Sequence, residues 1–251
     1  MAADTLGPMS DIATRILQSL AAVELERRRR AAAPALAPAV EALKAYQQRR
    51  FARTHASLLA HPRYGRAANF FLNELYGPQD FTQRDAQFSR IVPALVRLFP
   101  ADTVATVESL AAVHALSERL DTAMAIHLDG QAPTRASYVR AWQATGDPAS
   151  RARQIELVMS VGQALERHTR SFVLRASLKA MRGPARAAGM GALQTFLENG
   201  FDAFGAMGGA REFLSTIETR ETALCARLFD PVAVAAATGP LPPGDVLEQL
   251  P

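Results

Sequence analysis

The residues best placed to do chemistry lie between positions 102 and 128, a segment with the spacing of one long amphipathic helix. Its apolar arc consists of Leu110, Val113, Leu116, Leu120, Met124 and Leu128. Ser117, Asp121 and His127 fall inside this arc, and His114 falls at its edge. An unpaired carboxylate or imidazole is costly to bury. The pattern therefore predicts a buried polar cluster, with Glu118 slightly closer to solvent than His114.

Arg84 is the expected partner of Asp121. It lies on the apolar face of a predicted helix from Thr82 to about Phe99, and a cation in a first turn opposes the helix dipole. A residue that breaks two local rules at once usually has a compensating tertiary contact. We therefore expect the Arg84 guanidinium to bind the Asp121 carboxylate between packed helices, a geometry that suits this pair.

His114 and either Tyr76 or Tyr138 would complete this cluster, which allows two interpretations. In the first, it is internal scaffolding that fixes how the helices register. In the second, it lines a pocket for a small ligand or a haem around Arg84, His114 and Asp121, in a binding protein or an enzyme. The first is the one we expect, because no catalytic residue spacing is present.

Known cofactor and catalytic motifs do not match the chain. It contains neither Glu-x-x-His nor His-Glu-x-x-His, so no metal site is expected. A haem needs only one axial histidine, and nothing selects among His114, His127 and His168, so the cofactor stays unknown. Cys225, among leucines, is expected to be a buried hydrophobe rather than a nucleophile.

Helical periodicity runs through most of the sequence and predicts an all-α fold: one bundle-like domain of about eight to nine helices. We expect basic N-terminal helices over residues 10–59 and a core over 60–229. Within the core, one helix is expected from 150 to 182 and another from 202 to 229 with a kink at Gly208-Gly209. Residues 1–9 are expected to be disordered, as is the Pro- and Gly-rich tail of residues 231–251.

Composition argues for a cytoplasmic globular protein. Hydrophobic residues make up 49% of the 251, which is enough for a core, and no run of residues is long and apolar enough to span a membrane. The N-terminus has no apolar signal-peptide core, and the lone Cys225 cannot form an intrachain disulfide. Arginines 27 to 30 are expected to be a solvated helix face, so neither nucleic acid nor an anionic membrane surface is the expected partner.

Phe70-Phe71-Leu72, followed by Leu75-Tyr76-Gly77-Pro78 and Asp80-Phe81, resembles a family of uncharacterised proteobacterial helical proteins. The segments 181–185, 193–198 and 203–207 resemble it too. The similarity spans roughly residues 60 to 225, and leaves out the basic N-terminal helices and the tail. This resemblance implies an all-helical fold and carries no information about activity.

The N-terminal helix suggests how the protein could associate. We expect its apolar line of Ile12, Ile16, Leu20 and Val23 to dock on its own domain. If the helix instead projects from the domain, this line could pair with a partner helix. We therefore expect a non-catalytic helical module that mediates self-association or binding to another protein. A small-ligand- or haem-binding protein is the alternative.

Overall fold

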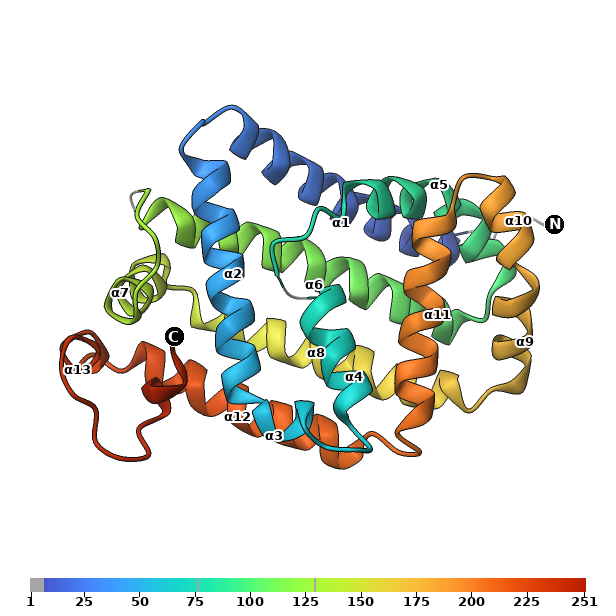
Figure 1. Cartoon of the computed structure of the whole chain (residues 1–251). Helices are drawn as coiled ribbons and strands as arrows, with labels where there is room; N and C mark the ends of the chain where they lie inside the picture. Colours follow the sequence, from blue (N-terminus) through green and yellow to red (C-terminus); the bar gives the residue numbers. More distant parts are fainter. Residues whose placement is uncertain (1–6, 76, 129) are drawn as a thin grey trace.

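The structure is all helical, as the sequence predicts. The computed structural model describes residues 7–75, 77–128 and 130–251, with side chains from residue 11 onward. Within these residues there is no strand, and nine helices have nine or more residues, in line with the expected eight to nine. They pack into one body, shown in Figure 1. None of the described helices combines the length and the apolar composition that a membrane span requires.

The longer helices are α1 (Gly7–Ala31), α2 (Leu36–Thr54), α5 (Thr82–Leu98), α6 (Ala101–Ile126), α7 (Arg135–Thr145), α8 (Pro148–Thr169), α9 (Phe172–Ala180), α11 (Gly191–Ala206) and α12 (Arg211–Phe229). Shorter segments join them: α3 (Ala56–Leu59), α4 (Gly65–Phe70) with a π-helical turn (Phe71–Leu75), α10 (Arg182–Ala187), α13 (Ala233–Thr238) and a 3-10 turn (Val246–Gln249).

Helix α6 lies at the centre of the body. Figure 1 shows α1, α6, α8 and α12 following one another across the molecule, with α2, α4 and α11 crossing them. Helix α6 packs against α1, α2, α5, α7 and α8. Both its apolar arc and its polar side therefore face other parts of the protein. Glu118, which we expected closer to solvent, is therefore buried.

Two predicted helix boundaries were wrong. The expected helix from 150 to 182 breaks at Ser171, whose hydroxyl accepts a hydrogen bond from the Leu174 backbone N–H and starts α9. The kink expected at Gly208-Gly209 is a full separation of α11 from α12. Gly208 and Gly209 have φ angles of +62° and +143°, which side-chain-bearing residues rarely adopt.

The C-terminal segment 231–251 is folded, so the expectation of a disordered tail was wrong. Leu247 is 0% exposed and joins the hydrophobic cluster formed by α2, α6, α7 and α12. Arg227 binds the Asp245 carboxylate at 2.9 Å. The prolines and glycines of segment 231–251 form turns between these two contacts. Of the expected N-terminal disorder, residues 1–6 lie outside the described residues, and α1 already begins at Gly7.

Candidate functional site

A cavity of about 230 Å³ lies where α2, α5, α6, α8, α11 and α12 meet. Its walls draw apolar residues from all three hydrophobic clusters of the described chain, among them Leu20, Leu110 and Leu224. Charged side chains line it as well: Lys44, Arg50, Arg84 and Arg151, with Asp85, Glu118, Asp121 and Glu221. So many charges inside a fold require specific partners.

Asp121 has the least compensated of these carboxylates. Gln47 donates a hydrogen bond from Nε2 to its Oδ1 at 3.0 Å, and no described residue hydrogen-bonds its Oδ2. Burial raises the pKa of the Asp121 carboxyl above its ordinary value, and Lys44 offsets this only in part. The fold therefore favours the protonated acid, which can donate a hydrogen bond as well as accept one.

The wall contributed by α7 and α8 carries further polar groups. The Arg151 guanidinium stacks on the Trp142 ring at 3.8 Å, and Gln154 donates a hydrogen bond to the Ser117 hydroxyl at 2.7 Å. The indole Nε1 of Trp142 is buried without a hydrogen-bond partner among the described residues. A buried indole N–H usually has an acceptor.

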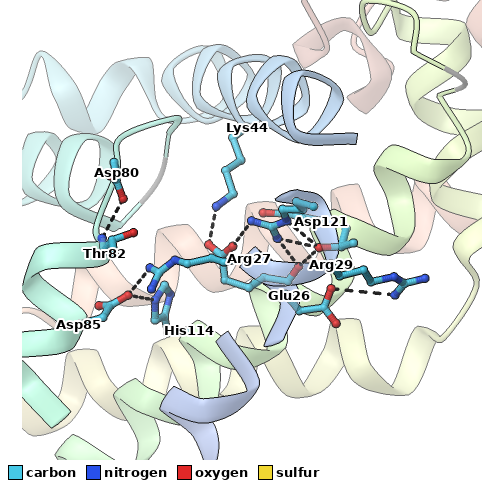
Figure 2. A network of polar contacts seen from close by, with 12 residues as sticks. Glu26, Arg27, Arg29, Lys44, Asp80, Thr82, Asp85, His114 and Asp121 are labelled. Atoms are coloured by element: carbon cyan, nitrogen blue, oxygen red, sulfur yellow. Dashed lines mark hydrogen bonds and ion pairs between the residues drawn. The ribbon is translucent and has the colours of Figure 1, made fainter. Parts of the chain in front are cut away.

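Asp85 joins three helices at a second point of the cavity. Its Oδ2 lies 2.8 Å from Nε2 of His114 on α6 and also binds the Arg27 guanidinium from α1, as Figure 2 shows. Burial alone would raise the pKa of Asp85, but His114 and Arg27 outweigh it and hold the pKa below its ordinary value. The carboxylate is therefore ionised in the folded protein.

Glu118 is the centre of a third polar group. Its partners show that our expectation of a solvated face for arginines 27 to 30 was wrong in part. Arg30 binds its carboxylate and also donates to its backbone carbonyl at 2.7 Å, and Lys44 binds the other carboxylate oxygen. Despite burial, Lys44 and Arg30 lower the pKa of Glu118. Arg27 and Arg30 are thus internal ion-pair partners rather than members of a solvated face, while Arg28 and Arg29 remain exposed.

Arg84 does not pair with Asp121. Its guanidinium lies between two aromatic rings, 3.9 Å from the Phe81 centroid and 4.4 Å from that of Phe196, and donates to the Glu74 carbonyl at 3.1 Å. Its nearest carboxylate is that of Asp85, at 3.8 Å. The expected compensating tertiary contact exists, but stacking on aromatic rings supplies most of it.

A fourth polar group, around Glu221 on α12, was missed by the sequence reasoning. Arg50 binds its carboxylate, and Nε2 of His55 lies 2.8 Å from the same oxygen. Burial would raise the pKa of Glu221, yet Arg50 and His55 lower it to about 2. Burial lowers the pKa of His55. The only sequence signal is an arginine and a glutamate within otherwise apolar helix faces, and their separation of 171 positions concealed the pair.

Four of the six predicted polar-cluster residues line the cavity: Arg84, His114, Ser117 and Asp121. His127 does not. It is exposed, because α6 ends at Ile126 and His127 is already its C-cap. Tyr76 lies outside the described residues, whereas Tyr138, the alternative to it, is buried in the cavity wall.

His114 and Ser117, two polar residues of the cavity wall, each have another hydrogen-bond partner. Nε2 of His114 is bound to Asp85, and the Ser117 hydroxyl to Gln154, with no hydrogen bond between His114 and Ser117 in the described structure. Hence no nucleophile–base pair is assembled there. In the same part of the chain, no three His, Cys, Asp or Glu side chains are placed to hold a metal ion. The cavity volume of about 230 Å³ is below the roughly 300 Å³ at which pockets for drug-sized ligands begin.

Comparison with protein families gives one match, to the model described as "Domain of unknown function (DUF8198)", over residues 26–234. The chain belongs to this family. The DUF8198 match begins at Glu26 and so includes Arg27, Arg30 and all of α2, which the resemblance described above had left outside. It therefore covers every charged residue of the cavity wall. No curated protein and no solved structure matches the chain significantly.

Proposed function

We propose that this protein binds a small, largely apolar organic molecule with a neutral polar head, such as a hydroxyl or a carbonyl, in the cavity beside Asp121. The observation that carries the proposal is the Asp121 side chain, which is buried, has one oxygen without a hydrogen-bond partner among the described residues, and has a raised pKa. A carboxylic acid kept protonated in a protein interior can donate a hydrogen bond to a ligand. A raised pKa in a cavity favours a functional site.

Trp142 supports the same interpretation. It lines the cavity, and its indole N–H is buried without an acceptor from the described residues. A ligand oxygen that reached the Trp142 N–H would accept its hydrogen bond, and one that reached protonated Asp121 would accept from that acid. Since the neighbouring carboxylates of Glu118 and Glu221 already have cationic partners, a neutral head suits the site better than a charged one.

Volume limits the size of the ligand. An apolar cavity of about 150 Å³ holds one benzene molecule, so 230 Å³ suits a ligand of about ten non-hydrogen atoms. The apolar body of such a ligand would contact side chains from α5, α8 and α11, including Phe88, Val158 and Leu193. The enclosed, mixed lining is typical of small-molecule sites between helices.

Self-association or binding to a protein partner, the function we expected first from the sequence, stays a prediction, as does the absence of catalysis. The buried polar groups are compatible with scaffolding. Scaffolding does not account for the Asp121 oxygen and the Trp142 nitrogen, which have no hydrogen-bond partner within the described part of the chain. A cytoplasmic location also remains our proposal. The partly buried Cys225 is the single cysteine and requires no oxidising compartment.

The first test is native mass spectrometry of the purified chain, compared with its denatured mass. Extra mass lost on denaturation would reveal a retained ligand. An empty protein would then be titrated with naphthol, a fluorescent probe of suitable size with one hydroxyl, and with naphthalene, which lacks the hydroxyl. We expect naphthol to bind more tightly than naphthalene, because only naphthol can satisfy the polar groups of the cavity.

Asp121→Leu tests whether binding depends on the predicted site, because leucine is of similar size and has no hydrogen-bonding group. Glu41→Leu provides the matched change on the exposed face of α2. Asp121→Leu should lose most of the preference for naphthol over naphthalene, while Glu41→Leu should keep it. If the protein is free of ligand and neither probe binds, or if Asp121→Leu binds naphthol as well as the wild type does, the proposed site is wrong.

A further inference from the structure

Helix α9 exposes an apolar face. None of its residues is buried, and Phe172 and Val173 are 80% and 70% exposed. Phe172 and Val173 share one continuous outward arc of the helix with Ala176, Lys179 and Ala180. Leu174 and Leu178 face the body. Met181, 47% exposed, follows directly. A surface helix normally places its polar side outward, so an outward apolar arc indicates a surface that binds something.

Cations surround this face. Between Arg167 and Leu197 the sequence contains six Arg or Lys residues and no Asp or Glu. Three of the six have carboxylate partners on neighbouring elements: Arg170, Arg175 and Arg182. The other three, Arg167, Lys179 and Arg186, are exposed and form no ion pair with the described residues. The surface of α9 and α10 is therefore both apolar and positively charged.

A second apolar element lies at the same end of the molecule. Leu98, the last residue of α5, is 69% exposed, and the turn from α5 to α6 lies at the same end of the body as α9 and α10 in Figure 1. The Thr106 hydroxyl near the start of α6 lies 3.0 Å from Nε2 of His168 at the end of α8. This contact joins the start of α6 to the end of α8, which α9 follows. Arg97 adds another exposed cation there.

We propose that this end of the protein, formed by α9, α10 and the turn between α5 and α6, binds an anionic phospholipid surface. Exposed Phe172 and Val173 would enter the boundary between headgroups and acyl chains, as in interfacial amphipathic helices. The unpaired cations beside them would contact lipid phosphates and carboxylates, whose charge is opposite to theirs. This interaction needs no spanning helix and does not depend on the ligand proposed for the cavity.

Charge favours a membrane over a second copy of the chain. In a two-fold symmetric dimer through this surface, Arg167, Lys179 and Arg186 would face the same three cations of the partner copy. Like charges at close range oppose such a contact. An anionic lipid surface instead complements the charge of Arg167, Lys179 and Arg186.

The test is sedimentation of the full chain with vesicles. One set is phosphatidylcholine alone, and the other contains about 30% phosphatidylserine, which resembles an anionic leaflet. We expect binding to the anionic vesicles only, weakened as the salt concentration rises because screening shortens the range of the attraction. Lys179→Glu/Arg186→Glu should reduce binding at least tenfold, since each cation near the surface contributes about fivefold.

Matched variants separate this surface from general effects of charge and hydrophobicity. Arg140→Glu/Arg211→Glu makes the same charge change at exposed positions on α7 and α12, and should bind far better than the α9–α10 variant. Phe172→Ser should lose binding, whereas Leu25→Ser, which alters a residue 66% exposed on α1, should keep it. Because all these side chains are exposed, circular dichroism should show an intact fold for each variant.

Three results would overturn the proposal. The first is no binding to anionic vesicles at low salt. The second is binding that Phe172→Ser and Lys179→Glu/Arg186→Glu leave unchanged. The third is a dimer, detected by sedimentation velocity, that Phe172→Ser dissociates, since this would assign the surface to a second copy of the chain.

Discussion

Nε2 of His114 lies 2.8 Å from Oδ2 of Asp85, and this contact fastens the central helix α6 to α5. Because the same carboxylate oxygen also binds Arg27 from α1, one buried oxygen holds three helices in register. The contact forms part of the cavity wall, so the packing of these helices and the shape of the proposed ligand site depend on the same atoms.

Asp85→Asn should therefore destabilise the fold strongly. The substitution leaves Arg27 and His114 largely buried without their counter-charge, and removing one partner of a buried pair typically costs about 3 kcal/mol or more. Urea unfolding at neutral pH measures this loss. Glu108→Gln is the control, because it breaks the exposed contact between α1 and α6 made by Arg15, which should contribute less than about 1 kcal/mol. Equal losses from the two variants would contradict the assigned role of Asp85.

Arg84→Lys tests the stacked guanidinium. Lysine keeps the charge but cannot place a planar cation between the Phe81 and Phe196 rings. We expect the free energy of unfolding to fall by about 1–2 kcal/mol. In a double-mutant cycle with Phe196→Leu, the two losses should not add, because both remove the same contact. Full additivity would mean that the rings and the guanidinium do not interact energetically.

The sequence predicted the helices better than their partners, for a physical reason. Helical periodicity and end signals are local, so the fold class and most of the segments that form α1, α5 and α6 were correct. Periodicity also showed that Arg84 and Asp121 are buried, but burial does not determine which buried groups meet. The actual partners, such as Gln47 for Asp121, come from a helix crossing about seventy residues away in sequence.

Leu247→Ala tests whether the C-terminal segment is part of the folded body. Proline and glycine content suggested disorder, but the Leu247 side chain is fully buried. Its truncation should lower the free energy of unfolding by about 2–5 kcal/mol. Val232→Ala, at an exposed position in the same segment, should change it by less than about 0.5 kcal/mol. A disordered tail would instead make the two variants indistinguishable in urea unfolding.

Glu221 should contribute to acid unfolding. Its folded-state pKa of about 2 lies well below the ordinary value for a glutamate, so the ionised form stabilises the fold. That contribution is fully present above about pH 5 and is lost as the pH falls from there toward 2. Glu221→Gln should therefore lower stability at pH 7 and flatten the stability curve between about pH 5 and 2. Glu41→Gln, at an exposed carboxylate, should reproduce the wild-type curve. If Glu221→Gln also reproduces it, the Glu221 ion pair contributes nothing to the free energy of unfolding.

Asp121 should have the opposite pH dependence, which separates a ligand-facing acid from a structural anion. Its folded-state pKa is raised, so the folded protein retains a proton that the unfolded chain releases. The stability contributed by Asp121 is therefore greatest below the unfolded pKa of about 3.9 and falls as the pH rises through the folded-state value. Asp121→Asn cannot ionise, so relative to the wild type it should be more stable at pH 7 than at pH 3. Unfolding by urea at the two pH values gives this difference directly. A variant that is less stable than the wild type at pH 7, and not at pH 3, would show that the fold depends on an ionised Asp121 and that the carboxyl is scaffolding.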